Sequence, residues 1–152
     1  MDFVSLSREL ISLRAKLNNL PSGESMIKMS EGENRVLSFL LSNGASAHPS
    51  QLSRSMSVST ARIAALLNRL EEKGMICRSC DPTDDRKIIV TLTEKGYSKI
   101  SSIIEDTVFD ISKILEALGE DDAKEYVRIQ KKLLTISADK KGSDHNQQQI
   151  SF

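Results

Sequence analysis

Apolar residues recur at helical spacing along most of the chain. Six of them near the N-terminus follow one another at intervals of three and four residues, which predicts a helix over 3–20. The stretch 21–23, Pro-Ser-Gly, should end that helix. Ser30 and Glu33 form the S-x-x-E pattern of a capping box, so we expect a second helix from Ser30 to Asn43.

The pattern then predicts two short helices joined by a tight turn. Pro49 suits the first turn of the first helix, the chain breaks at Ser57, and Ser59 should cap a second helix over 60–73. The buried face of this second helix is expected to consist of Ile63, Leu66, Leu67 and Leu70. Its opposite face remains polar and carries arginines.

Beyond Gly74 the hydrophobic period changes from helical to extended. Residues 75–79 and 87–92 predict two strands, and the second of these stretches is rich in β-branched side chains. The six residues 81–86, Asp-Pro-Thr-Asp-Asp-Arg, have turn chemistry. We therefore expect a β-hairpin with a long charged tip.

The C-terminal part returns to helical spacing. Thr93 is expected to cap a helix over 94–118, whose apolar stripe is wider than one small domain would cover, so a partner chain should cover part of it. Gly119 breaks this helix and another follows over 120–135. From Ser137 onward the sequence has no periodicity, and we expect a disordered tail over 137–152.

Composition restricts the class of protein. The length of 152 residues is typical of one domain, and 21 basic against 21 acidic residues give no net charge, so any nucleic-acid surface must be local. No apolar run is long enough for a membrane span, and the N-terminus lacks the features of a signal peptide. We therefore expect a cytoplasmic protein without membrane contact.

The order of elements resembles the MarR family of bacterial transcription regulators over about residues 5–135. Three motifs carry the resemblance: E-x-K-G at 71–74 and the residues before it, D-x-R at 84–86, and L-T-x-x-G at 92–96. It implies a mainly α winged helix-turn-helix protein with a small β-hairpin wing and a helical dimerisation lobe from both termini. The domain would span 1–136, with the DNA-binding lobe over about 30–93 and dimerisation helices over about 3–20, 94–118 and 120–135.

The resemblance also implies which residues contact duplex DNA. The N-terminal side chains of the second helix of such a motif reach base edges. Arg62 has a bidentate donor fork for guanine, Arg69 is better placed for phosphate, and Asp84 would orient Arg86 in the minor groove. The candidate DNA-binding residues are Ser59, Thr60, Ala61, Arg62, Ala65, Arg69, Arg78, Asp84, Arg86 and Lys87. Without that context, Arg62 and Arg69 would be the solvated side of an amphipathic helix, and the wing an exposed turn with an ordinary ion pair.

In the family, the terminal helices form a homodimer that represses transcription from a pseudo-palindromic operator, and a pocket beside the dimer interface takes small-molecule effectors. The candidate dimer-interface residues are Leu6, Leu10, Leu13, Ile104, Val108, Ile111 and Leu115. The chain departs from the common pattern at His48, where a Thr or Ser cap is usual, at Ser57, where glycine is frequent, and at Ala64 and Ala65. Residues 48–95 carry eight basic and six acidic side chains, an excess of only two, so affinity should depend on dimerisation.

Two other classes of function receive less support. Cys77 and Cys80 form a C-x-x-C, but positions three apart on a strand point to opposite faces, which opposes a disulfide, and a zinc site would lack ligands. No motif of an enzyme is present, and neither a cofactor nor a metal is expected. The alternative to DNA binding is a winged-helix module that binds protein through the same surface.

Overall fold

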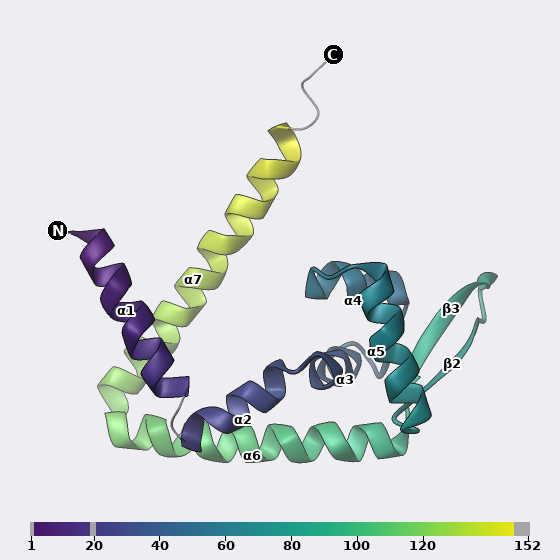
Figure 1. Ribbon diagram of the computed structural model, residues 1–152, viewed down its shortest axis with the longest axis horizontal. Coiled ribbons are helices and arrows are strands. Elements are labelled where there is room, and N and C mark those ends of the chain that lie inside the picture. The colour runs from purple at the N-terminus through teal and green to yellow at the C-terminus, as the bar shows by residue number, and fades with distance from the viewer. Residues whose placement is uncertain (1, 19–20, 148–152) are drawn as a thin grey trace. The chain divides into compact units, whose positions relative to one another are not determined.

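The computed structural model describes residues 2–18 and 21–147 (Figure 1). The chain divides into two compact units, Met1–Asp110 and Ile111–Phe152. The chain is mainly helical. The helices are α1 (Phe3–Asn18), α2 (Pro21–Ser30), α3 (Gly32–Ser42), α4 (Pro49–Met56), α5 (Thr60–Glu72), α6 (Glu94–Leu118) and α7 (Glu120–Gln147). Helix α6 contains the boundary between the two units, and the second unit consists of its last turns and α7.

One small antiparallel sheet belongs to the first unit. Its strands are β1 (Ser46–Ala47), β2 (Ile76–Asp81) and β3 (Asp84–Leu92), in the order β1-β3-β2. Strands β2 and β3 form a hairpin, which we call the wing. Helix α5 contacts β2, so the wing lies beside α5 (Figure 1).

The hydrophobic core of the first unit joins helices α3, α4 and α5 to the sheet. The apolar face predicted for α5 is buried as expected, with every one of its four residues at most 4% exposed. This core also contains residues of α3, α4, the sheet and α6, among them Leu37, Leu40, Leu52, Ile76, Val90 and Ile100. The core therefore fixes α5 and the wing on one rigid support.

The prediction was wrong for residues 21–31. The stretch 21–23 does not end helical structure but begins α2, because Pro21 fits the first turn of a helix, where its missing N–H costs nothing. The predicted capping box is absent: α3 begins at Gly32, and Ser30 Oγ donates instead to the Ile27 carbonyl at 2.7 Å, closing α2. The end of the first predicted helix, residues 19–20, lies outside the described residues.

Two further expectations differ from the structure. The ladder of the wing extends to the pair Asp81 and Asp84, so only Pro82 and Thr83 form the turn, and the long tip is wrong. Helix α7 continues to Gln147, so the expected disorder of 137–147 is wrong as well. No proline interrupts that stretch, and adding a residue to an existing helix costs little even without an apolar face. Residues 148–152 lie outside the described residues.

Candidate nucleic-acid interface

The turn between α4 and α5 aims the N-terminus of α5 outward. Ser57 adopts a left-handed backbone with φ 53°, and the N–H of Val58 returns to the Ser53 carbonyl at 3.2 Å. Ser59 then caps α5 as predicted, its Oγ accepting from the Arg62 N–H at 3.3 Å. This geometry explains why glycine is frequent at the position of Ser57, since left-handed backbone strains residues with a side chain.

The exposed face of α5 holds the predicted base-reading residues. Its apolar side is buried, and the side chains of Ser59, Thr60, Ala61, Arg62 and Ala65 all face solvent. In the part of the chain that the structure describes, no acidic side chain forms an ion pair with the Arg62 guanidinium. Its donor fork is thus available to a ligand.

Arg69, the predicted phosphate contact, is already paired. Its Nε lies 3.2 Å from Glu33 Oε1, and Lys73 Nζ donates to Glu33 Oε2 at 2.6 Å. One carboxylate of α3 therefore binds two cations, Arg69 of α5 and Lys73 at the C-cap of that helix. Arg69 keeps 57% of its side chain exposed, so it can still meet a phosphate.

Arg78 connects the wing to α5. Its guanidinium donates to Asn68 Oδ1 at 2.8 Å and lies 3.4 Å from Glu71 Oε2, with 26% of the side chain exposed. This candidate DNA-binding residue thus has two partners on the helix. The geometry favours a brace between β2 and α5 over a free cation.

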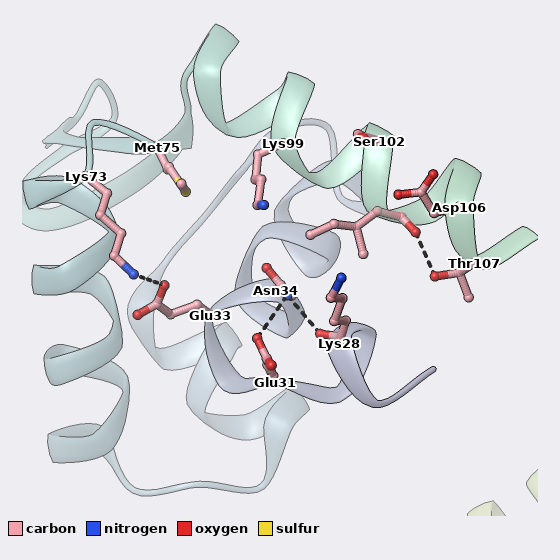
Figure 2. Close-up of a pocket in the computed structure, with 11 residues that line it drawn as sticks. Lys28, Glu31, Glu33, Asn34, Lys73, Met75, Lys99, Ser102, Asp106 and Thr107 are labelled. Atoms are coloured by element: carbon pink, nitrogen blue, oxygen red, sulfur yellow. Dashed lines mark hydrogen bonds and ion pairs between the residues drawn. The ribbon is translucent and has the colours of Figure 1, made fainter. Parts of the chain in front are cut away.

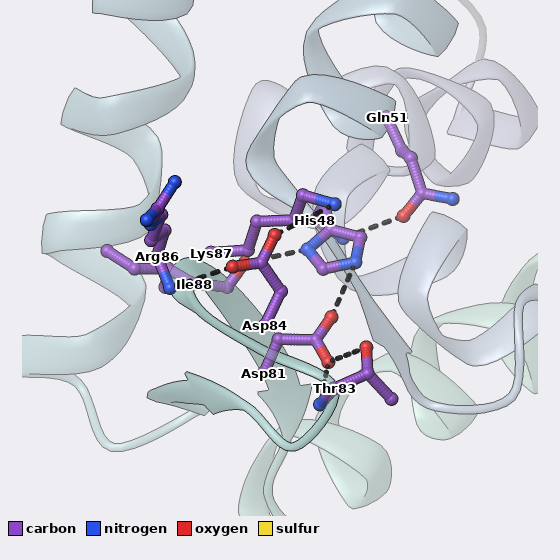
Figure 3. Close-up of polar contacts among 8 residues, drawn as sticks. All are labelled: His48, Gln51, Asp81, Thr83, Asp84, Arg86, Lys87 and Ile88. Carbon is purple, nitrogen blue, oxygen red and sulfur yellow. Dashed lines mark hydrogen bonds and ion pairs between the residues drawn. The ribbon is translucent and has the colours of Figure 1, made fainter.

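The D-x-R motif is present but arranged differently from the expectation. Asp84 Oδ1 accepts from the backbone N–H of Arg86 at 3.1 Å, and Oδ2 lies 3.3 Å from Lys87 Nζ. Figure 3 shows the Arg86 side chain pointing away from this cluster. The carboxylate therefore holds the backbone at the start of β3 and pairs with Lys87, and it does not contact the guanidinium that it was expected to orient.

His48 links the start of α4 to both strands of the wing. Its Nδ1 lies 2.9 Å from the Ile88 carbonyl oxygen of β3, and its Nε2 lies 3.0 Å from Asp81 Oδ2 at the end of β2 (Figure 3). The hydroxyl and the backbone N–H of Thr83, which donate to Asp81 Oδ1, hold the pKa of the Asp81 carboxyl below its ordinary value. His48 and Lys87 lower that pKa further.

The E-x-K-G and L-T-x-x-G motifs form one junction. Thr93 Oγ1 donates to the Gly74 carbonyl at 2.7 Å and accepts from the Gly96 N–H at 3.1 Å, which confirms Thr93 as the cap of α6. A Cβ on Gly96 would lie 2.0 Å from the Met75 carbonyl oxygen, so only glycine fits. The motifs that carry the family resemblance thus connect the end of α5 to the start of α6.

A pocket of about 460 Å³ lies in the first unit, between α2, α3, the end of α5 and α6. Figure 2 shows the ammonium groups of Lys28 and Lys99 pointing into it. Asn34 forms part of its floor and donates to the Lys28 carbonyl at 2.8 Å. Lys73 and Met75 also line it, so its wall includes the end of α5 and the residue that contacts Gly96.

The predicted dimer residues divide into two groups. The three leucines of α1, Leu6, Leu10 and Leu13, are each about half exposed, and Val108 of α6 is 58% exposed. Ile104 packs against the core of the first unit, and Ile111 and Leu115 are half-buried. The exposed group leaves apolar surface for a partner, whereas Ile104 serves the fold of the chain itself.

Cys77 and Cys80 are free and exposed. Over the described residues, no cluster of three or more His, Cys, Asp or Glu side chains is suited to hold a metal ion, and no helix has the length and apolarity needed to cross a membrane.

Sequence reasoning missed the partners that position the interface. Glu33 was assigned to a capping box, and Asn68 and Glu71 were given no role as partners, because contacts between elements leave no periodic pattern in a sequence. His48 was noted only as an unusual cap, and that departure from the common pattern was the sole indication of its role.

Comparison with known proteins identifies relatives of one kind. Residues 22–103 match the family described as transcriptional regulator SarA/Rot. The chain is 28% identical over 100 residues to the HTH-type transcriptional regulator PecS of Dickeya dadantii, and 27% identical over 104 residues to the HTH-type transcriptional repressor YetL of Bacillus subtilis. These matches cover 64% and 66% of the chain but only 60% and 61% of the length of the two relatives.

Solved structures agree on the fold. A MarR family protein from Bacillus stearothermophilus superposes with a TM-score of 0.72 at 23% identity, covering 89% of this chain and 94% of that one. The YusO protein of Bacillus subtilis does so with a TM-score of 0.66 at 25% identity, covering 89% and 99%. The predicted winged helix-turn-helix fold is thereby confirmed.

Proposed function

The chain belongs to the SarA/Rot family of transcriptional regulators, and we propose that it binds a pseudo-palindromic DNA duplex as a homodimer and represses transcription in response to a small molecule. Its family is one of regulators and not of enzymes. Such a regulator would act in the cytoplasm, on the DNA that it controls. One observation carries the proposal: Arg62 on α5 is exposed and has no acidic partner among the described residues, and Arg86 on the neighbouring wing also faces solvent.

The positions of the charged residues suggest different roles for them in binding DNA. Arg62 lies in the first turn of α5, where side chains of a recognition helix reach base edges, and a bidentate contact with guanine needs a free guanidinium. Arg86 suits the narrow minor groove, where the negative potential is enhanced. Arg69 and Lys87 remain exposed beside their acidic partners and would contact phosphates, while Arg78 positions the wing.

Exposed apolar helix faces support dimerisation. Leu6, Leu10 and Leu13 lie on one side of α1 and are each about half exposed, and on α7 Tyr126 and Leu133 are similarly exposed. A single chain in water gains by covering such faces, since each square ångström of apolar surface removed from water contributes about 25 cal/mol. A second copy would also supply the second recognition helix that a pseudo-palindrome requires.

The pocket in the first unit is the candidate effector site. Its volume of about 460 Å³ lies within the range of small-molecule sites, and its charged lining favours a polar ligand. Lys73, which lines it, is bound to the same Glu33 as Arg69. A ligand that displaced Lys73 from Glu33 would therefore also alter the ion pair between Glu33 and Arg69 on the exposed face of α5.

A salt-dependent gel shift tests the proposal. Operators are first selected from a random duplex pool, and binding is then measured at two or more salt concentrations. We expect tight binding to selected duplexes, weaker binding to random ones, and affinity that falls steeply with salt. Failure to bind any duplex at low salt would contradict the proposal and favour the protein-binding alternative.

Two substitutions separate base reading from phosphate contact. Arg62→Ala should cost about 1 to 3 kcal/mol on the selected operator and relax the preference at one base pair. Arg69→Ala should weaken selected and random duplexes alike and lower the salt slope by about one per monomer. Lys131→Ala on α7, outside the helix-turn-helix, is the control for loss of one positive charge. Equal losses on both kinds of duplex for Arg62→Ala would contradict its reading role.

A further inference from the structure

His48 stands at the N-cap position of α4, but its side chain does not cap the helix. It precedes α4, and its backbone N–H is satisfied by Gln51 Oε1 at 2.7 Å. The Gln51 N–H donates to the His48 carbonyl oxygen at 3.0 Å, and the ring makes no capping hydrogen bond. Its two nitrogens reach the two strands of the wing instead, Ile88 O at 2.9 Å and Asp81 Oδ2 at 3.0 Å. With 30% of the side chain exposed, the ring fills the space between α4 and the wing.

Both partners of the ring are acceptors. A backbone carbonyl has no proton to donate, and the Asp81 carboxylate has none either while it is ionised. Neutral imidazole has one N–H and one lone pair, so it satisfies only one of these two acceptors. Imidazolium has two N–H groups and satisfies both, and histidine side chains exchange these forms between about pH 5 and pH 8.

The charged groups around the ring come from both strands of the wing. Asp81 lies at the end of β2, and Asp84, Arg86 and Lys87 lie on β3, where Arg86 and Lys87 line the same surface depression as His48. Asp84 binds Lys87 at 3.3 Å, which leaves Asp81 as the acid that contacts the ring directly. Thr83 fixes the Asp81 carboxylate through its other oxygen.

We propose that His48 is a proton-dependent positioning residue for the wing, which in its doubly protonated form ties β2 and β3 to the helix-turn-helix and so raises affinity for duplex DNA. The Ile88 carbonyl lies only two residues from Arg86, and Asp81 pairs across the wing with Asp84, which lies two residues from Arg86 on the other side. Loss of one hydrogen bond on deprotonation frees one strand from α4. Arg86 must then be ordered again when DNA binds, which weakens binding.

This proposal rests on the proposed DNA binding, and its first test is the pH dependence of that binding. At constant ionic strength, we expect the affinity of the parent protein for its selected operator to fall by about tenfold between pH 6 and pH 8. A tenfold change is the effect of one ionisable group whose pKa differs by about one unit between free and DNA-bound protein. His48→Gln should remove most of this dependence. His145→Gln, which removes the only other histidine of the sequence, is the matched control and should keep it.

Asp81→Asn is the sharpest variant, because the two carboxylate oxygens have separate partners. Asparagine retains an oxygen for Thr83 and places an NH2 group opposite His48 Nε2, where it donates to neutral imidazole. Both bonds of the ring then exist without a second proton. We expect the affinity of Asp81→Asn for the operator to be independent of pH between pH 6 and pH 8, whether that affinity is higher or lower than that of the parent protein. If His48 acted instead by its own charge on phosphates, the dependence would persist in Asp81→Asn, and that result would overturn the proposal.

A measurement without DNA separates this proposal from the proposed function. In ¹⁵N spectra of the full chain, both ring nitrogens of His48 should be protonated at low pH, and the amides of Thr83 and Arg86 should shift with the same midpoint as the ring. These amide shifts should be absent in His48→Gln. If no duplex binds at any pH, DNA binding fails while the spectra still decide the role of His48. Wing amides that do not change with pH would overturn it.

Discussion

Asp84 fixes the backbone at the start of β3 and also pairs with a neighbouring cation. Its Oδ1 accepts from the Arg86 backbone N–H, and its Oδ2 pairs with Lys87, whose side chain is 62% exposed. Asp84→Asn would keep an acceptor for the backbone while removing the negative charge and releasing Lys87. We expect duplex binding to tighten about two- to fivefold at low salt, as the small energy of an exposed charge pair implies.

The salt series supplies the control for this prediction. The gain should shrink as salt rises, because screening weakens exposed charges, and the salt slope should steepen by about one per monomer. Asp84→Ala, which also loses the acceptor, should bind less tightly than Asp84→Asn. Weaker binding by Asp84→Asn than by the parent protein would mean that the negative charge itself orders Arg86, as the family resemblance first suggested.

Single residues were predictable where a local rule applies. Ser59 and Thr93 cap helices as expected, because a cap depends on the few residues that follow it. Arg78 and Asp84 differ from expectation because their roles depend on partners, Asn68 in one case and a backbone N–H in the other. An arginine in a sequence carries no mark of the acid or amide that folding places beside it.

At the scale of elements, the junction of the wing and α6 explains why two motifs occur together. Thr93 binds Gly74, and Lys95 Nζ donates to the Lys73 carbonyl at 2.8 Å. Periodicity predicted α5 and α6 themselves, since each has one clear apolar face. It missed α2, whose short sequence begins with residues that also form turns, and β1, whose two residues are too few to show alternation.

Gly96→Ala tests the close approach at this junction. The added Cβ would lie 2.0 Å from a backbone carbonyl, which cannot move aside as a side chain can, so we expect a loss of about 1 to 3 kcal/mol or more. Thermal unfolding measures it. Gly32→Ala is the matched control, because its Cβ meets only the flexible end of Leu66 at 3.0 Å. Equal stability of the two variants would contradict the packing described here.

At the scale of the whole molecule, the sequence predicted the fold more fully than the interface. The order of elements and three glycine-containing or charged motifs were enough to indicate a winged helix-turn-helix, because that fold is set by local patterns in series. Association between chains follows from surfaces, and a single sequence shows only that apolar residues exceed the core. Exposure in the structure selects among them, favouring Leu10 and Val108 over Ile104.

Leu10→Asp therefore tests dimerisation without disturbing the core. Leu10 is 51% exposed on α1, so the substitution should leave the stability of an isolated chain nearly unchanged. A symmetric interface would bury the new charge twice, and the dimer dissociation constant should rise at least about tenfold. Sedimentation velocity measures the change, and Ser12→Asp, on another side of the same helix, should not cause it.

Operator binding should weaken with the dimer, because a monomer offers one recognition helix to a two-fold site. A parent protein that sediments as a monomer at micromolar concentration would refute the dimer, and a Leu10→Asp protein that remains dimeric would exclude this face of α1 from the interface.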